Sequence, residues 1–361
     1  MREFVYRTGP ADVVFGKGTL SQLPDVIRNQ GSKRALLLAT PEQAAQVEAL
    51  GKSLGQLAAA YFHEAAMHTP VEVTERAMKV VEAEAIDVVV AFGGGSTIGL
   101  GKAIALQTGI PLIAIPTTYA GSEMTPIIGQ TENGRKTTQR SMKVLPRAVI
   151  YDVDLTLSLP AGLSGRSGIN AIAHAAEGLY AKDTNPVMQL IAEEGIRALA
   201  LALPVIYQRP DDQDARAEAL YGAWLCGFVL GTVGMALHHK LCHSLGGRFD
   251  LPHADTHTII LPHAIAYNSP AIPQALVRLR RALNTEEPAG ALFDLARSVG
   301  APRGLKDLGM PESGVAIAVK DALESSYWNP RPLDAENLAA MLKRAWAGER
   351  PDACLQVSAS R

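Results

Sequence analysis

Apolar runs and helical patterns alternate along the first 159 residues of the chain. Three runs are continuous and rich in branched side chains, a pattern typical of strands that a parallel sheet buries on both faces. They are Ala35–Ala39, Asp87–Phe92 and Pro111–Ile115. Between them, Pro41–Leu54 and Val71–Glu84 repeat apolar residues at helical spacing. This alternation predicts an α/β layered domain.

Two further features complete this domain. Ile127–Thr138 predicts a hairpin that turns at Asn133–Gly134, because this pair easily adopts positive φ. Val149–Tyr151 predicts a last strand, and the Leu-Pro step after it predicts a domain boundary at Leu159. The first domain is therefore expected over residues 1–159.

The pattern changes from residue 160 onward, where long stretches rich in Ala and Leu are helical in period. The predicted helices cover residues 166–182, 187–208, 212–247 and 286–299. Proline and glycine interrupt the pattern at residues 250–252, 269–273, 300–304 and 329–332. We therefore predict an all-α domain over residues 160–361, with a loose tail over residues 349–361, where periodicity is lost.

Composition narrows the class of protein. A chain of 361 residues suits two domains, and a hydrophobic content of 47% with 19% charged residues is typical of a soluble globular protein. The formal net charge of -2 offers no basic surface to nucleic acid. No signal-peptide core or run of about 20 apolar residues is present, so no membrane partner is expected. Three cysteines without CxxC spacing argue against a disulfide framework and favour a cytoplasmic location.

Candidate chemistry gathers between Gly234 and Asn268, a stretch that holds six of the nine histidines. Histidine suits acid–base catalysis and metal ligation near neutral pH, so the cluster predicts a functional site. Any single one of these histidines can instead be a core or capping residue that a backbone carbonyl satisfies. The six are His238, His239, His243, His253, His257 and His263.

Two loops in the first domain predict a cofactor site. Gly94, Gly95 and Ser96 follow the Asp87–Phe92 strand and open a helix, where backbone N–H groups and the helix terminus favour a pyrophosphate. The glycine spacing is not GxGxxG, and a tight turn is the alternative. The second loop follows the next strand, at the edge where open α/β sheets bind ligands, and its hydroxyls could hold ribose, phosphate or substrate. Its polar residues include Thr117, Thr118, Tyr119 and Ser122.

Residues at helical spacing extend the histidine cluster. Asn170 and His174 are four residues apart and share one helix face, as do His239 and His243. Together with His253 they could form a metal site or an acid–base site between two helices.

The motifs resemble those of the iron-containing alcohol dehydrogenase superfamily, from about Phe15 to Gly348. The resemblance rests on GGGS, PTTYAGSE, the helix with Asn170 and His174, and HHKLCHSLGG…LPHADTH…LPH. Within the superfamily the chain is most similar to the maleylacetate reductases. The supporting stretches are HTPVE, TTYAGSEMTPIIGQTENGRKTT, HHKLCHSLGGRFDLPHADTH and SSYWNPRP.

The resemblance implies a fold, a cofactor and a reaction. The fold is a Rossmann-like α/β domain that binds a nucleotide, followed by an all-α domain, as in dehydroquinate synthase, with the active site in the cleft between them. The reaction is the reduction of maleylacetate to 3-oxoadipate by NADH or NADPH during the breakdown of aromatic compounds. Members of the group are commonly homodimers.

Two positions depart from the wider superfamily. Its metal-dependent members use an Asp and three His, and the matching residues here are Asn170, His174, His239 and His253. An amide oxygen is a poor ligand for Fe²⁺ or Zn²⁺, so we expect no metal, although three histidines can hold Zn²⁺. NAD-specific relatives often have an Asp at the end of the Ala35–Ala39 strand, where this chain has Thr40. NADPH is therefore expected to be accepted beside NADH.

The resemblance also suggests residue roles. We expect hydride addition to a double bond conjugated to a ketone, with His243 or His253 supplying the proton and Tyr119 helping to hold the substrate. Asn170, His174 and His239 are expected to contact the substrate. The two carboxylates of the substrate are expected to bind cationic side chains, and Arg331 is preferred over Lys240 and Lys136 for this role. Each of these residues can instead be a solvated surface residue.

Three alternatives remain from the sequence. A metal-dependent alcohol or polyol dehydrogenase would share the fold, and Asn170 argues against it. A lyase related to dehydroquinate synthase would consume no NADH. A binding protein without catalysis would leave the cofactor and histidine motifs without a purpose.

Overall fold

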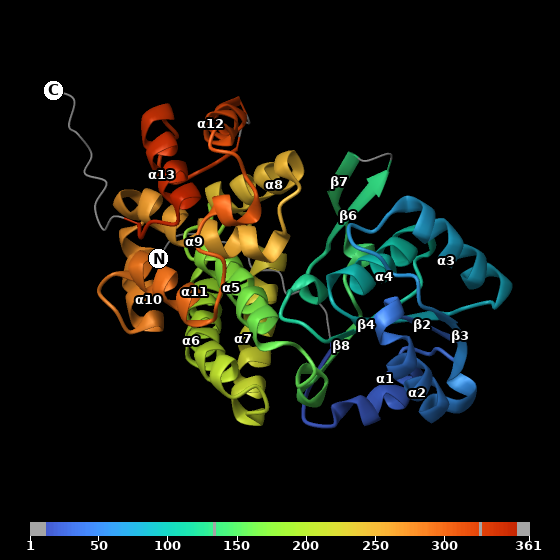
Figure 1. The fold of residues 1–361 in the computed structure, drawn as a ribbon. Helices are drawn as coiled ribbons and strands as arrows, with labels where there is room; N and C mark the ends of the chain where they lie inside the picture. The colour runs from blue at the N-terminus through green and yellow to red at the C-terminus, as the bar shows by residue number, and fades with distance from the viewer. Residues whose placement is uncertain (1–11, 133–134, 325–326, 352–361) are drawn as a thin grey trace. The chain divides into compact units, whose positions relative to one another are not determined.

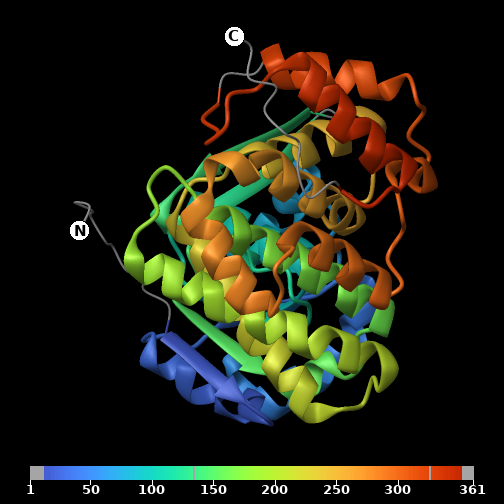
Figure 2. The same cartoon turned by 90° about the vertical axis from the view of Figure 1, so that its left-hand side faces the viewer.

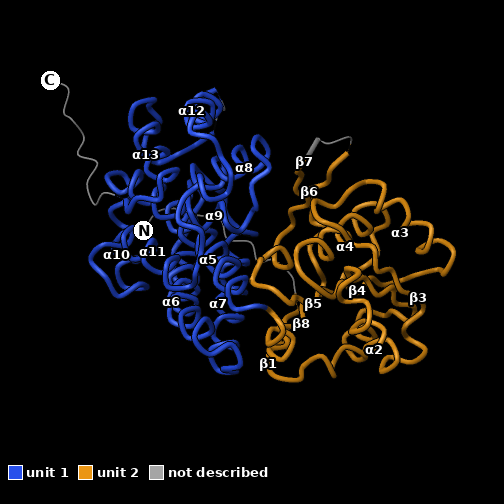
Figure 3. Tube along the Cα trace, in the orientation of Figure 1, with its two compact units in different colours: residues 1–6, 160–361 blue, residues 7–159 orange. Residues whose placement is uncertain are grey.

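The structure, a computed structural model, describes residues 12–132, 135–324 and 327–351. It consists of two compact units, which we call the N-terminal unit and the C-terminal unit (Figures 1 and 3). The N-terminal unit ends at Leu159, and the C-terminal unit begins at Pro160.

A six-stranded parallel sheet forms the centre of the N-terminal unit, in the order β1-β8-β5-β4-β2-β3. Its strands are β1 (Asp12–Gly16), β2 (Ala35–Leu38), β3 (Ala58–Phe62), β4 (Val88–Gly93), β5 (Leu112–Pro116) and β8 (Ala148–Asp152). Its helices are α1 (Leu23–Asn29), α2 (Ala44–Leu54), α3 (Val71–Ala83) and α4 (Gly95–Thr108). Helices α1 and α2 pack on one face of the sheet, and α3 and α4 cover the other (Figure 1).

The predicted buried strands and the hairpin are confirmed. Strands β2, β4, β5 and β8 are buried along their whole length. The hairpin pairs β6 (Ile127–Glu132) with β7 (Arg135–Arg140), while its predicted turn residues, Asn133 and Gly134, lie outside the described residues. Strands β1 and β3 were not predicted. They form the two edges of the sheet and are only partly buried, so they lack the continuous apolar run that identifies a central strand.

The C-terminal unit is helical, as predicted, and no strand occurs among its described residues. Its helices are α5 (Ala161–Gly178), α6 (Pro186–Gln208), α7 (Gln213–Thr232), α8 (Leu237–Phe249), α9 (His253–Asn268), α10 (Pro273–Leu283), α11 (Pro288–Ser298), α12 (Gly314–Glu324) and α13 (Ala335–Ala347). Figure 2 shows this unit from another side, with α12 and α13 packed together in red. Helix α9 packs against α5, α8, α11 and α13 and is buried from Thr256 to Asn268.

The prediction of one helix over residues 212–247 is wrong. Residues 233–236 are not helical, and helices α7 and α8 on either side of them differ in direction by 93°. Val233 is extended, which ends α7, and α8 begins beside a buried carboxylate described below. No single helix of the described chain is long and apolar enough to cross a membrane. The bent pair of α7 and α8 passes that test together, by length and composition.

Candidate functional site

The carboxyl ends of three neighbouring strands form the candidate cofactor site of the N-terminal unit. Thr40 follows β2, Gly94 follows β4, and Thr117 follows β5. Gln43 joins the outer two ends, because its Nε2 donates to Thr117 Oγ1 at 3.2 Å. The backbone N–H of Thr117 donates to the carbonyl of Gly93 at 3.1 Å. Sequence reasoning missed Gln43, since its partner lies 74 residues away.

The turn between β4 and α4 requires glycine and leaves room for a ligand. Gly93 has φ of 147°, and a Cβ there would lie 2.6 Å from Thr97 Oγ1 and 2.7 Å from Gln43 Oε1. Gly95 is exposed, and a Cβ on it would meet no atom within 4 Å. Helix α4 has neither a side-chain cap nor an acidic residue in its first turn. Its N-terminus therefore fits the pyrophosphate of a dinucleotide.

A buried lysine fixes the loop after β5. Lys102 Nζ donates to the carbonyl oxygens of Ser122 at 2.6 Å, and of Thr125 and Ile127 at 2.8 Å. Burial lowers the pKa of Lys102 to about 7, while the nearby Glu123 carboxylate favours its charged form. This lysine was not singled out in the sequence, although it lies seven positions after Gly95 in the same helix.

Tyr119 and Glu123 lie within this loop and are fully buried. Glu123 Oε1 accepts a hydrogen bond from the hydroxyl of Tyr151 in β8 at 2.9 Å, and burial raises the pKa of the Glu123 carboxyl. Thr118 and Ser122 are partly exposed and open to a ligand. The loop is thus anchored to the sheet at Glu123 and to α4 at Lys102.

Three helices of the C-terminal unit bring the histidines together. Helix α8 packs against α9, and α9 packs against α5. His243 and His253 are exposed, whereas His238 and His257 are fully buried. Helix α5 supplies Asn170, His174 and Glu177, α8 supplies His238, His239, Cys242 and His243, and α9 supplies His253 and His257. The cluster therefore has an exposed rim and a buried floor.

Glu177 organises the floor of this cluster and was missed in the sequence. Its fully buried carboxylate accepts hydrogen bonds from the backbone N–H of Ala236 at 2.9 Å and of His238 at 2.8 Å, at the start of α8. It also bonds to Nδ1 of His239 at 2.7 Å. Its spacing could have identified it, because Glu177 lies three residues after His174 and therefore on the same helix face.

This carboxylate determines the tautomers of two histidines. Glu177 accepts from His239 Nδ1, so the proton of neutral His239 lies on Nδ1 and its Nε2 is an acceptor. His174 Nδ1 lies 2.8 Å from that Nε2 and must therefore be the donor. Nε2 of His174 is then left with a lone pair. The charge of Glu177 thus orders a chain of two hydrogen-bonded imidazoles.

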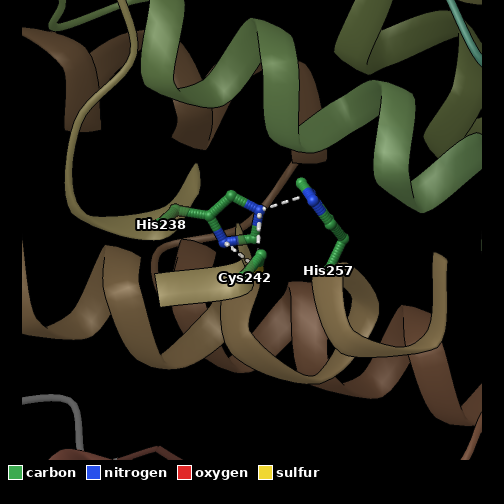
Figure 4. Close-up of side chains that lie close together, drawn as sticks. All are labelled: His238, Cys242 and His257. Atoms are coloured by element: carbon green, nitrogen blue, oxygen red, sulfur yellow. Dashed lines mark hydrogen bonds between the residues drawn. The ribbon is translucent and has the colours of Figure 1, made fainter. Parts of the chain in front are cut away.

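A second hydrogen-bonded pair lies deeper, where His238 Nε2 is 3.0 Å from His257 Nδ1 (Figure 4). Cys242 Sγ lies 3.8 Å from His238 Nε2. Burial, with a smaller contribution from neighbouring imidazoles, lowers the pKa of His238 and His257 well below the ordinary value. Both rings are therefore neutral near pH 7. The ring of exposed His253 lies 4.3 Å from that of His257 between centroids, which links the rim to the floor.

The four positions that match the superfamily's metal ligands do not offer its donor set. Asn170 supplies a neutral amide oxygen, Oδ1, which is buried and has no hydrogen-bond partner among the described residues. Nε2 of His239 already bonds to His174, and the Glu177 carboxylate is engaged by α8 and His239. The anionic oxygen ligand that balances Fe²⁺ is therefore missing from this set.

The three candidate cations differ in their surroundings. Arg331 is buried, its Nη1 donates to the carbonyl of Tyr267 at 2.8 Å, and its guanidinium lies 4.5 Å from the centre of the Tyr267 ring. Lys240 is exposed, with Nζ 5.9 Å from the ring centre of Tyr327. The side chain of Lys136 lies outside the described part of the structure. Carboxylate binding by Arg331 stays a prediction.

Comparisons with known proteins place both halves of the chain in the same family. Residues 10–153 match the iron-containing alcohol dehydrogenase family, and residues 165–346 match the C-terminal part of the Fe-containing alcohol dehydrogenase family. The maleylacetate reductase of Rhizobium sp. strain MTP-10005 is 53% identical over 98% of this chain and 100% of that protein.

Two solved structures are also similar. The maleylacetate reductase of Agrobacterium tumefaciens is 53% identical, with a TM-score of 0.95 over 97% of this chain and 100% of that one. The iron-containing alcohol dehydrogenase of Corynebacterium glutamicum is 42% identical, with a TM-score of 0.93 over 98% and 99% of the two chains.

Proposed function

The chain belongs to the iron-containing alcohol dehydrogenase family, and we propose that within it the protein is a maleylacetate reductase. It reduces the carbon–carbon double bond of maleylacetate and forms 3-oxoadipate, with NADH or NADPH as the reductant. Identity above 50% over nearly the whole chain to maleylacetate reductases supports this function.

The observation that favours this chemistry in the site is the hydrogen-bonded chain of Glu177, His239 and His174. When an alcohol dehydrogenase reduces a carbonyl group, the product forms as an alkoxide, and a metal stabilises this alkoxide as a Lewis acid. Reduction of a double bond conjugated to a ketone creates an enolate, which is a much weaker base. Hydrogen-bond donors are enough to stabilise such an oxyanion, so we propose that the reaction is metal-independent.

The exposed histidines of the cluster, His243 and His253, carry out the proton transfer. When bound, the nicotinamide supplies hydride to the carbon β to the ketone. His243 or His253 then supplies a proton to the α carbon, since these two are the exposed histidines of the cluster. The other rim histidine holds the substrate, and Arg331 binds a carboxylate. Tyr119 is fully buried, so it supports the loop after β5 rather than the substrate directly. Asn170 and His174 contact the substrate from the floor, while His239, whose two ring nitrogens bond to Glu177 and His174, orients His174.

Cofactor choice depends on the residues after β2. Thr40 replaces an acidic residue that would repel a 2′-phosphate, so we propose that NADPH is used beside NADH. The Thr40 side chain hydrogen-bonds to Glu42, which lowers the pKa of this exposed carboxylate and keeps it charged. Glu42→Gln should therefore raise the efficiency with NADPH relative to NADH. NADPH efficiency below about a hundredth of that with NADH, a gap of about 2.7 kcal/mol, would contradict the proposal.

The partners that we propose are a small dicarboxylate and a second copy of the chain. The substrate expectation follows from the reaction, and the homodimer from the resemblance to maleylacetate reductases. Light scattering of the purified protein measures the mass of the assembly, and a monomer would contradict the dimer.

Product analysis tests the function directly. The purified protein is mixed with freshly made maleylacetate and NADH, and both 3-oxoadipate and NADH are quantified. We expect one 3-oxoadipate for each NADH consumed. The alternative is a metal-dependent alcohol or polyol dehydrogenase, which the family name favours. Oxidation of simple alcohols after addition of Fe²⁺ or Zn²⁺, without turnover of maleylacetate, would support that alternative instead.

A further inference from the structure

Two imidazoles and a thiol meet in the buried floor of the C-terminal unit, next to the positions that match the family's metal ligands but made of different residues. His238 and Cys242 are four residues apart on α8 and share one face, which is turned toward His257 on α9 (Figure 4). All three side chains are buried, and one ligand atom from each lies within 4.8 Å of the other two. The proposed reaction does not use this set.

The spacing is close to that of a tetrahedral site. Metal–ligand distances of about 2.0–2.1 Å for nitrogen and about 2.3 Å for sulfur give edges of about 3.3 Å and about 3.6 Å in a tetrahedron. The observed separations are 3.0 Å from His238 Nε2 to His257 Nδ1 and 3.8 Å from Cys242 Sγ to His238 Nε2. Small side-chain rotations would complete the geometry.

A second observation marks the same place. Nε2 of His257 is buried and has no hydrogen-bond partner among the described residues, so this ring has a polar atom that the protein leaves unsatisfied.

The cluster also provides an entry path. His253 and His243 are exposed, and the centroid of the His253 ring lies 4.3 Å from that of the His257 ring, with the two rings tilted by 53°. A cation that arrives at this exposed rim reaches the buried ligands through the contact between the His253 and His257 rings.

We propose that His238, Cys242 and His257 form a binding site for a thiophilic divalent cation of the Zn²⁺ class. Two imidazoles and a thiolate favour a borderline d¹⁰ ion over Mg²⁺ or Ca²⁺, and water takes the fourth position. The thiol of Cys242 releases its proton on binding. Binding draws His257 toward the cation and away from His253, whose ring it contacts, so Zn²⁺ inhibits the enzyme reversibly. This last step rests on the proposed function, whereas the binding does not.

Cobalt spectroscopy tests the binding. Co²⁺ is titrated into the full-length, metal-free protein with Cys354→Ser throughout, which leaves Cys226 and Cys242 as the cysteines of the chain. We expect sulfur-to-cobalt charge-transfer absorption and tetrahedral visible absorption that saturate at one Co²⁺ per chain and disappear when Zn²⁺ is added. Cys242→Ser should abolish the charge-transfer band. Cys226→Ala, which removes the other buried thiol, should retain it.

Two more variants separate this site from the family position. Loss of a residue that only supports a metal ligand weakens metal binding by about 10–100-fold. His257→Asn removes a ligand and should therefore weaken Co²⁺ binding by more than this. His174→Asn should leave Co²⁺ binding unchanged. Circular dichroism checks that each variant is folded. The proposal is overturned by the absence of the charge-transfer band in the parent protein, by its persistence in Cys242→Ser, or by its loss in His174→Asn.

Inhibition is measured separately, as maleylacetate turnover with and without Zn²⁺. Zn²⁺ should slow the parent protein at least tenfold and Cys242→Ser much less, while Mg²⁺ should slow neither. Equal inhibition of both proteins would overturn the inhibitory role. If maleylacetate is not a substrate, the cobalt spectra still decide whether the site exists.

Discussion

Glu177 connects the backbone of α8 to the imidazole chain, so its charge can be tested apart from its shape. Glu177→Gln keeps the size of the side chain but offers one oxygen where the carboxylate offers two. We expect kcat to fall at least about 100-fold, because His239 and His174 lose their fixed tautomers. Unfolding in urea should show a loss of about 1–3 kcal/mol. Glu286→Gln, at an exposed carboxylate, is the control and should change neither kcat nor the free energy of unfolding.

The two rim histidines are distinguished by their kinetics. His243→Gln and His253→Gln are each assayed for kcat and KM with maleylacetate. The proton donor should lose about 10²–10⁴-fold in kcat, whereas a residue that only holds the substrate should mainly raise KM. Near wild-type kcat in both variants would exclude both residues as the acid.

His263 gives the protein a measurable sensitivity to acid. Burial, and then the nearby Arg344 charge, lower its pKa from 6.5 to about 4, so the folded protein keeps a neutral ring. Below pH 6.5 the unfolded chain gains a proton that the folded chain does not. Stability should therefore fall as the pH drops toward 4, by up to about 1.4 kcal/mol per pH unit from this group.

Urea unfolding between pH 7 and pH 4.5 checks this dependence in the wild type and in His263→Leu. The variant should show a shallower loss of stability toward acid, whatever its stability at pH 7. Identical slopes for the two proteins would show that His263 titrates normally.

At the scale of elements, a substitution at the start of α4 can test whether this helix terminus binds NADH without disturbing the fold. Gly95→Ala adds a methyl group where no protein atom lies within 4 Å, so the free energy of unfolding should stay the same or rise by up to about 1 kcal/mol. The dissociation constant for NADH, measured by fluorescence titration, should rise at least tenfold because the methyl blocks the pyrophosphate. Gly247→Ala, also in open space on α8, should leave NADH binding unchanged. Equal NADH binding by Gly95→Ala and the wild type would remove α4 from the cofactor site.

The elements also show where sequence reasoning succeeds and fails. The central strands were predictable because burial on both faces leaves continuous apolar runs such as Ala35–Leu38. The break between α7 and α8 was not, because Ala and Leu continue the helical pattern on both sides of it. The start of α8 depends on the Glu177 carboxylate, which is 59 residues from Ala236 in the sequence. Local periodicity contains no information about such a partner.

Across the whole molecule, the candidate site was predictable where its residues are close in sequence. The histidines of α8 and α9 lie within one short stretch, and the glycines open one helix. Glu177, Gln43 and Lys102 were missed because each acts through partners that the fold brings from other segments. The resemblance to a family supplied the reaction, which local patterns alone could not.

The central claim is that hydrogen bonds from the histidine cluster, rather than a metal, support the reduction of maleylacetate. The most direct measurement follows NADH oxidation with freshly made maleylacetate before and after exhaustive chelation. We predict that the rate survives chelation and does not rise when Fe²⁺ is added. A rate that vanishes on chelation and returns with Fe²⁺ or Zn²⁺ would contradict the claim.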